Sequence, residues 1–357
     1  MIYLNQIGNR LPTLVIGGNF VATIYDIAKL CNVSTATVSR VLSGSDHPIH
    51  PDTREKILKA AKELNYRPNT IAKSLASGKT RTIALFVPTI ANDFYTQIAE
   101  AMEDGLNDAG YITYLCNTKR CILKETEYVN NIITRRVDGV IFSPTRVKPE
   151  DNVKNQKNIE ELRRHNIAIV AFGSRFDGVS QVSVDTYRGS YEATKYLISL
   201  GHRRIGFIDG LTAGTSGNRR KGYMAALKSE SIDIDETLIM DGNLKMEGGY
   251  KNAIEMLNMN EPPTAIFAVN NLMAIGVLKA ARDMDVEVPE KLSVIGFDDS
   301  ILSELIEPSL TVVRQPLNDM GNTAVKLLLD QLDGKKDVCS IKLEPTLIKR
   351  DSCSRVY

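Results

Sequence analysis

The chain has 357 residues, of which 43% are hydrophobic, and it carries 44 basic and 43 acidic side chains and no tryptophan. This length predicts two or three domains of ~100–200 residues, each able to bury a core. The composition excludes a disordered, highly charged chain, and no apolar run approaches the ~20 residues of a membrane-spanning helix.

The balanced charge conceals two segments of opposite sign. Residues 21–80 contain nine Lys and Arg against five Asp and Glu, a balance of +4. Residues 1–20 add one Arg, so residues 81–357 carry 34 basic and 38 acidic side chains, a balance of −4. The net charge of +1 alone would argue against a nucleic-acid partner. A small basic module joined to a larger acidic body is compatible with one.

The cysteines and the N-terminus indicate a cytoplasmic protein. The five cysteines show no CxxC and no Cys/His pair at zinc spacing, so we expect reduced thiols; they are Cys31, Cys116, Cys121, Cys339 and Cys353. Residues 1–20 have neither the basic n-region nor the small-residue cleavage site of a secretory signal.

Residues 23–42 predict two short helices around a tight turn. Thr23 and Asp26 form a capping box, and the apolar stripe behind it is Ile24, Ile27, Ala28 and Leu30. Ser34 is a good N-cap for the second helix. Val38, Val41 and Leu42 face inward, which leaves a small, polar face that suits a reader of the DNA major groove: Thr35, Ala36, Ser39 and Arg40.

A third helix is predicted from Pro51 to the stop at Arg67-Pro68. Its buried stripe is Ile57, Leu58, Ala61 and Leu64. Asn69 then caps a fourth helix over residues 70–76, which Gly78 closes. At roughly two turns this helix is shorter than the ~12–15 residues that are marginal in water, so we expect it to fold only when another molecule holds it.

From Thr82 onward, short β-branched runs alternate with amphipathic helices. The predicted strands are 83–87, 111–115, 139–142, 167–172, 205–208, 265–269 and 294–297, with late strands near Thr311 and Ile341. The predicted helices include 98–109, 187–200, 220–229 and 274–285. This alternation is typical of an α/β fold with doubly wound parallel sheets, and the strand number fits two similar lobes. A ligand would bind in the cleft at the carboxyl ends of the strands.

No catalytic motif accompanies this cleft. The sequence lacks GxGxxG after a strand, GxxxxGK[ST], GxSxG and HExxH, and its four histidines do not group with a nucleophile. His202 is interpreted as a residue of a helix-to-strand turn or of lobe packing. We therefore predict no catalytic residue, no metal site and no cofactor.

Three N-terminal segments resemble the headpiece and hinge of the lactose-repressor (LacI/GalR) family: ATIYDIA at 22–28, NVSTATVSRVL at 32–42 and YRPNTIAKSLA at 66–76. The resemblance continues in one collinear order to about residue 352, through IANDFY at 90–95, RVDG at 136–139, LGHRRI at 200–205, PTA at 263–265, IGFDD at 295–299 and LTVVRQP at 310–316. It implies an all-α helix-turn-helix headpiece followed by a two-lobed core like a periplasmic binding protein.

The resemblance implies four segments. They are an extension over 1–20, a DNA-binding headpiece over 21–68, a hinge over 69–80, and an effector-binding and dimerisation domain over 81–357. Lobe 1 is expected at 81–184 and 315–340, and lobe 2 at 185–314 and 341–357. Residues 1–20 have no family counterpart, and residues 17–21 are compatible with a ribosome-binding sequence before a GTG start, so we expect the natural chain to begin at Val21. The absence of a heptad-bearing tail favours a dimer over a tetramer.

The family implies a homodimeric repressor whose recognition helices enter major grooves while paired hinge helices open the minor groove between them. The base readers implied are Thr35, Ala36, Ser39 and Arg40. Contacts to phosphates or groove edges are implied for Tyr25, Ser34, Thr37, Thr53, Tyr66 and Asn69, and a further hinge contact for Ala72. Leu75 matches the family's minor-groove wedge. The alternatives from the residues alone are a solvated Arg40 and a Leu75 that packs on Ile71.

The resemblance also implies a small-molecule effector between the lobes. Phe94 and Tyr95 match aromatic positions that cover the ligand, and Arg219 and Asn271 match its polar anchors. The family usually has an aspartate at the position of Asn271, so with Arg219, and with Arg175 as a further candidate, the pocket should be more positive than usual. We expect a carboxylated or phosphorylated sugar derivative, an expectation that calorimetry showing tight binding only to neutral sugars or purines would refute. A surface salt bridge is the alternative role of Arg175.

Two other classes remain open at this stage. A solute-binding protein of a transporter shares the two-lobed architecture, but it would need a signal peptide and no basic headpiece. A sugar-metabolising enzyme, such as a kinase or dehydrogenase, is the third alternative. Retention of residues 21–80 on DNA would favour the regulator.

Overall fold

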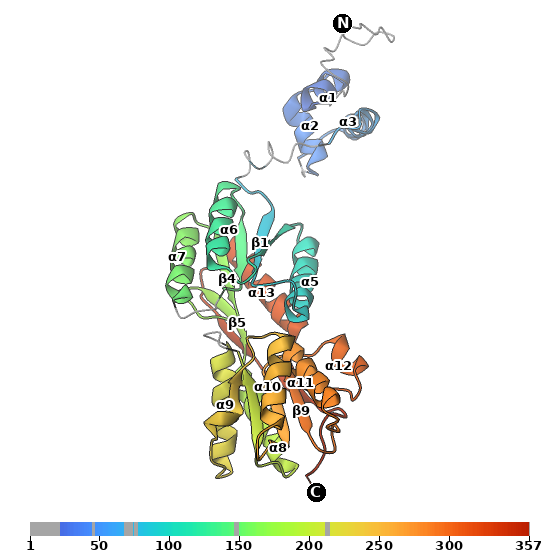
Figure 1. Ribbon diagram of the computed structural model, residues 1–357. Helices are drawn as coiled ribbons and strands as arrows, with labels where there is room; N and C mark the ends of the chain where they lie inside the picture. The colour runs from blue at the N-terminus through green and yellow to red at the C-terminus, as the bar shows by residue number, and fades with distance from the viewer. Residues whose placement is uncertain are drawn as a thin grey trace, which may run out of the picture. The chain divides into compact units, whose positions relative to one another are not determined.

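The computed structural model describes residues 22–44, 47–67, 74, 78–145, 150–210 and 215–356. The chain divides into two compact units, Met1–Thr80 and Arg81–Tyr357 (Figure 1). The extension over 1–20 lies outside the described residues, as does the fourth helix expected over 70–76, of which only Ser74 is described.

Within its described residues, the N-terminal unit contains the helices α1 (Ile24–Cys31), α2 (Thr35–Leu42) and α3 (Pro51–Glu63). The predicted starts of α1 and α2 are confirmed. The Asp26 carboxylate accepts the Thr23 backbone N–H at 2.8 Å, and Ser34 Oγ accepts the Thr37 backbone N–H at 3.1 Å. The buried core is Ile27, Ala28, Cys31, Val38, Val41, Ile57, Ala60 and Ala61.

Two residues of the predicted apolar stripes lie outside this core. Leu30 is 48% exposed and Leu58 is 49% exposed, whereas Cys31 and Ala60 are buried. At 3.6 residues per turn, each leucine lies roughly 100° from the centre of its helix's buried face, so the prediction that they face inward is wrong. Helix α3 also ends before the predicted stop, because Asn65 adopts a left-handed conformation with φ 47°.

The second unit contains two six-stranded sheets within its described residues. The first has the order β11-β5-β4-β3-β1-β2, is parallel throughout, and consists of β1 (Thr82–Val87), β2 (Ile112–Asn117), β3 (Gly139–Phe142), β4 (Ala168–Phe172), β5 (Ser180–Val184) and β11 (Ser340–Leu343). The second has the order β12-β10-β9-β8-β6-β7 and consists of β6 (Ile205–Asp209), β7 (Ile239–Asp241), β8 (Ala265–Ala268), β9 (Ser293–Phe297), β10 (Thr311–Arg314) and β12 (Thr346–Ile348). Only β12 runs antiparallel to its neighbour among these strands. The predicted α/β fold with two parallel-sheet lobes is confirmed.

Helices cover both faces of the first sheet (Figure 1). α5 (Asp93–Asp108) and α13 (Leu317–Leu332) pack on one face, and α6 (Ile122–Thr134) and α7 (Asp151–Arg164) on the other. In the second lobe α8 (Thr186–Ser199) packs on α9 (Thr215–Ser229), and α10 (Met246–Leu257) packs on α11 (Asn271–Asp283). The short helix α12 (Ile301–Leu305) precedes β10.

The chain passes between the lobes at three places. It leaves the first lobe between β5 and α8 and returns to it between β10 and α13. It then crosses again between β11 and β12, because β11 pairs with β5 of the first sheet whereas β12 pairs with β10 of the second. This last crossing falls after Leu343, slightly later than the boundary expected after residue 340.

The close contact between α8 and α9 generates a stability prediction. A Cβ atom at Gly222 of α9 would lie 2.2 Å from the Tyr187 carbonyl oxygen, whereas one at Gly217 of the same helix would have no atom within 4 Å. We expect Gly222→Ala to lower the free energy of unfolding by about 1–3 kcal/mol, because the two helix backbones must separate. Gly217→Ala should raise it by about 0.5–1 kcal/mol through helix propensity. Urea unfolding of the full chain measures both, and equal effects would contradict the close packing.

A buried carboxylate supports the segment that follows β3. Glu125 of α6 is fully buried, and its carboxylate accepts the Thr145 backbone N–H at 2.6 Å and the Asn158 side-chain amide at 2.9 Å. The Asn155 amide donates to the Thr145 carbonyl at 3.0 Å. Burial raises the pKa of Glu125 from 4.5 to about 7, although the hydrogen bonds act in the opposite direction.

This pKa predicts a pH-dependent stability. Between pH 4.5 and 7 the folded chain holds a proton on Glu125 that the unfolded chain releases. The contribution of Glu125 to the free energy of unfolding is therefore fully present below pH 4.5 and is lost as the pH rises through 7. The total loss is roughly 3 kcal/mol. Glu125→Gln cannot ionise and should flatten this slope. Glu127→Gln, at an exposed position of α6, should keep it. Urea midpoints at about pH 5 and pH 8 measure the slope, and a slope that persists in Glu125→Gln would show that other groups cause it.

Candidate effector cavity and DNA-reading surface

A cavity of about 700 Å³ lies between the two lobes of the second unit. Pro88, Ser143 and Ser174 line it from the loops that follow β1, β3 and β4, and Arg219 and Asp298 line it from the second lobe. Its volume falls within the ~300–1,000 Å³ of small-molecule sites. The sequence-based expectation of a cleft at the carboxyl ends of the strands is therefore confirmed.

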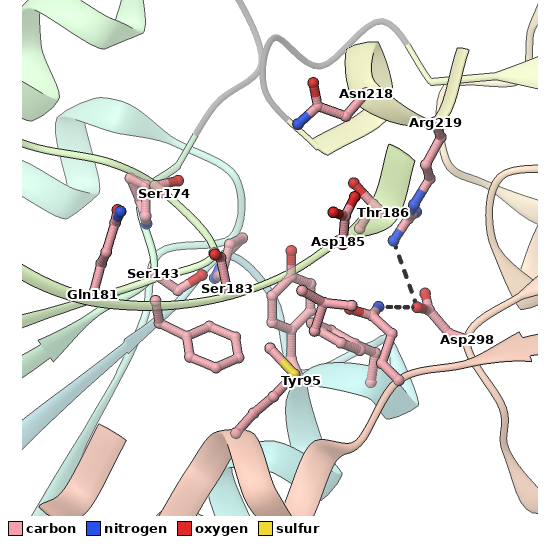
Figure 2. Close-up of a pocket in the computed structure, with 18 of the residues that line it drawn as sticks. Tyr95, Ser143, Ser174, Gln181, Ser183, Asp185, Thr186, Asn218, Arg219 and Asp298 are labelled. Carbon is pink, nitrogen blue, oxygen red and sulfur yellow. Dashed lines mark hydrogen bonds and ion pairs between the residues drawn. The ribbon is translucent and has the colours of Figure 1, made fainter. Parts of the chain in front are cut away.

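The cavity wall is rich in groups that can bind hydroxyls. Its hydroxyl-bearing residues include Ser143, Ser174, Ser183, Thr186 and Ser340, and its amide side chains are Asn92, Gln181, Asn218, Asn270 and Gln315. Amide side chains donate and accept, and hydroxyls do the same, so this wall matches a polyhydroxylated ligand. Figure 2 shows Gln181 and three serines of the first lobe on one side, across the cavity from Arg219 and Asp298; the serines are Ser143, Ser174 and Ser183.

Arg219 is the most firmly held cation of the cavity. The residue is 7% exposed, its guanidinium carbon lies 3.8 Å from the centre of the Phe297 ring, and its Nη1 donates to the Val269 carbonyl. Its Nη2 lies 3.6 Å from Asp298 Oδ1 (Figure 2). Nε has no hydrogen-bond partner in the described part of the chain. Burial lowers the pKa of Arg219, and the charge of Asp298 opposes this effect, so the guanidinium stays charged.

Asp298 completes this pair from the end of β9. Its backbone has a φ of 69°, in the left-handed region, which turns the chain directly after the strand. Gln315, which follows β10, donates its side-chain amide to Asp298 Oδ1. The pair thereby joins α9 to the loops after two strands of the second sheet.

Phe94 and Tyr95 lie at the start of α5. Asn92 caps this helix, because its side-chain oxygen accepts the Phe94 backbone N–H at 3.0 Å. The two rings pack edge to face with centroids 4.9 Å apart. Burial raises the pKa of Tyr95, so its hydroxyl stays protonated and can donate a hydrogen bond inside the cavity.

The structure brings four of the five expected effector residues to the cavity: Phe94, Tyr95, Arg175 and Arg219. It does not bring Asn271 there. The Asn271 amide donates to Ser300 Oγ at 2.6 Å, and its oxygen accepts from Ser303 Oγ at 3.2 Å, so the side chain supports the start of α12. The neighbouring Asn270, which caps α11 through the Met273 backbone N–H, lines the cavity instead.

Several lining residues were missed from the sequence. Arg120, Asp185 and Lys342 line the cavity, as does Asp298. Arg120, Asp185 and Asp298 each follow a strand of a parallel sheet within a few residues. That position was the available signal, because the residues after parallel strands meet at one edge of the sheet.

The headpiece presents the expected reading face on α2. Ala36, Ser39 and Arg40 are exposed and Thr35 is half-buried, and Arg40 Nη1 lies 3.3 Å from His47 Nε2. Among the expected phosphate contacts, Tyr25 is 73% exposed, Ser34 is exposed, and Thr37, Thr53 and Tyr66 are half-buried. Asn69, Ala72 and Leu75 lie outside the described residues.

His202 has a structural role, as interpreted from the sequence. It is buried, its Nδ1 lies 2.9 Å from Thr264 Oγ1, and its Nε2 lies 3.1 Å from the Ser354 carbonyl. Over the described ranges, no group of three His, Cys, Asp or Glu side chains could hold a metal ion. Within the same ranges, no helix has the length and apolar character needed to cross a membrane.

Comparison with known proteins identifies both units. Residues 23–69 match the family model of bacterial regulatory proteins of the lacI family, and residues 194–353 match that of the periplasmic binding protein-like domain. The HTH-type transcriptional regulator DegA of Bacillus subtilis is 37% identical over 337 residues, which cover 93% of this chain and 98% of DegA. Catabolite control protein A of Priestia megaterium is 35% identical over 310 residues, which cover 86% of this chain and 91% of that protein.

Solved structures show the same likeness. A Lac repressor dimer bound to operator and the anti-inducer ONPF has a TM-score of 0.83 at 26% identity, covering 94% of this chain and 100% of that one. A complex of the transcriptional regulator CelR with cellobiose has a TM-score of 0.70 at 30% identity, covering 93% of this chain and 99% of that one. With a relative at 37% identity over nearly its whole length and with matches in both units, the chain belongs to the lacI family of bacterial regulatory proteins.

Proposed function

We propose that this protein represses transcription as a dimer on a pseudo-palindromic operator, and that a sugar or sugar derivative between the lobes controls its binding. The observation that carries the proposal is the combination, in one chain, of an exposed reading face on α2 and a two-lobed cavity of ligand size. The relatives are transcriptional regulators, which supports a regulator rather than an enzyme. We propose that it acts in the cytoplasm, where an operator on the bacterial chromosome would lie.

The headpiece supplies both components of DNA recognition. The basic balance of residues 21–80 favours approach to phosphates. The small side chains of Thr35, Ala36 and Ser39 allow α2 to come close to base edges, and Arg40 can donate two parallel hydrogen bonds to a guanine. The Lac repressor structure, a dimer bound to operator, supports a twofold arrangement with one headpiece on each half-site.

The cavity supplies the control. A ligand that contacts Tyr95 and Ser143 of the first lobe and Arg219 of the second favours one arrangement of the lobes, which the three crossings between them permit. We propose that this arrangement changes the distance between the two hinges of the dimer, and thereby whether they fold together in the minor groove. Both an inducer and a corepressor are compatible with this geometry.

Arg40 is the residue proposed to read a base through two hydrogen bonds. We expect Arg40→Ala to reduce discrimination between a selected operator and a scrambled duplex by about 1–3 kcal/mol, because a bidentate base contact is lost. Lys62→Ala removes a charge from an exposed position of α3 and should leave discrimination unchanged. Fluorescence anisotropy with duplexes selected from a random pool measures both. If the wild-type chain binds no duplex, that result would contradict the proposed regulator function and favour a solute-binding protein.

The proposed control requires that ligand binding in the cavity and operator binding by the headpiece are coupled. We expect at least one member of a sugar panel to change operator affinity by about 1–3 kcal/mol. Arg219→Gln should abolish this change while leaving operator binding intact, because it removes the guanidinium through which we propose that the second lobe contacts the ligand. The adjacent Arg220, which pairs with Glu236 at 2.8 Å, does not line the cavity, so Arg220→Gln is the matched control. An effector response that survives in Arg219→Gln would contradict the assigned role.

A further inference from the structure

The cavity carries an excess of positive charge. Among its described lining residues, the cations are Arg120, Arg175, Arg219 and Lys342, and the carboxylates are Asp185 and Asp298. The excess lies inside a unit whose residues 81–357 have a net negative balance. It is therefore local to the cavity and does not reflect the composition of the unit.

Both carboxylates of the cavity are already engaged. Asp298 lies 3.6 Å from Arg219 and accepts from Gln315. Asp185 accepts the Arg188 backbone N–H at 3.0 Å, which caps α8, and lies 3.4 Å from Lys342 Nζ. Arg219 and Lys342 are thus the two cations that have a protein carboxylate beside them.

The other two cations have no such partner. The side chains of Arg120 and Arg175 make no ion pair or hydrogen bond with the described residues. Both follow strands of the first sheet, Arg120 after β2 and Arg175 after β4. Arg120 lies close enough to Tyr95 for its charge to lower the pKa of the phenol, against the larger effect of burial. The uncompensated charge therefore lies on the first-lobe side of the cavity.

We propose that the effector is an anionic sugar derivative, with a carboxylate or a phosphate whose charge Arg120 and Arg175 compensate. The hydroxyls of Ser143, Ser174 and Ser183, which Figure 2 shows on the first-lobe side, bind the sugar or further oxygens of the anionic group. The inference rests on the proposed function, because it specifies the ligand of the same cavity.

Charge compensation also gives selectivity. When the lobes enclose a ligand, Arg120 loses part of its water, and a charged group that loses water without a counter-charge is costly. An anionic ligand supplies the counter-charge, whereas a neutral sugar of the same shape leaves the arginines unpaired. Discrimination against the neutral sugar follows from this difference.

Calorimetry on the full-length chain tests the inference with matched sets of ligands. Each set contains a neutral hexose or pentose, its 6- or 5-phosphate, and its uronic or aldonic acid, and the two anionic arms distinguish phosphate from carboxylate. We expect an anionic member to bind at least tenfold more tightly than its neutral parent. Arg120→Gln and Arg175→Gln should each weaken that binding about tenfold. Neither should weaken any binding of the neutral parent, because the glutamine has no charge that must lose water unpaired.

Arg282→Gln removes an exposed arginine at the end of α11, outside the cavity, and should not change affinity. Tighter binding of a neutral parent, no binding of any anionic member, or unchanged affinity in both cavity variants would each overturn the inference. Operator binding, measured on the same samples, separates the two proposals: a neutral sugar that alters it overturns only the anionic effector, whereas a wild-type chain that binds no operator contradicts the proposed function.

Discussion

The parallel order of the strands is the constraint on which the site depends. Parallel strands all end at one edge of their sheet. The loops after β1, β3, β4 and β9 therefore bring polar side chains to the same space, although these loops are far apart in the sequence. The three crossings between the lobes join the two sheets in one unit, and the cavity lies between them. A ligand that contacts both lobes can therefore act on their arrangement, which a site within one lobe could not do.

Much of this fold could be predicted from local sequence patterns, because a run of β-branched residues indicates a buried strand and an apolar stripe indicates the buried side of a helix. The seven β-branched runs and the late positions near Thr311 and Ile341 all correspond to strands. The strands β5, β7 and β12 were not predicted. β5 has the sequence SQVSV, whose polar residues hide the strand pattern, although three of its positions are buried. Leu30 and Leu58 show the converse error, since hydrophobicity alone does not fix which side of a helix packs.

The cavity was less predictable, because its residues are assembled by tertiary structure. Phe94, Tyr95 and Arg219 were found through a family resemblance, which transfers positions and carries no local geometry. Asn271 shows the limit of that transfer: the residue after a helix N-cap points away from the residue that caps, so Asn270 and Asn271 face different surroundings. Arg120 and Asp298 needed the strand order, since only the sheet brings their loops together.

The net charge differs in sign between the whole chain, its second unit and the cavity within that unit. The formal charge of +1 is the sum over a basic headpiece and an acidic second unit. Within that acidic second unit, the described lining of the cavity has more cations than carboxylates. The buried pair of Arg219 and Asp298 is weak support for stability, because desolvation of both charges offsets their attraction. The pair is better explained as a means of positioning the Arg219 guanidinium. This group is held by Asp298, by the Phe297 ring and by the Val269 carbonyl. Its buried Nε has no partner in the described residues. Because the protein holds this guanidinium in place at the wall of the cavity, we propose that it is positioned for a ligand that brings its own hydrogen-bond acceptors.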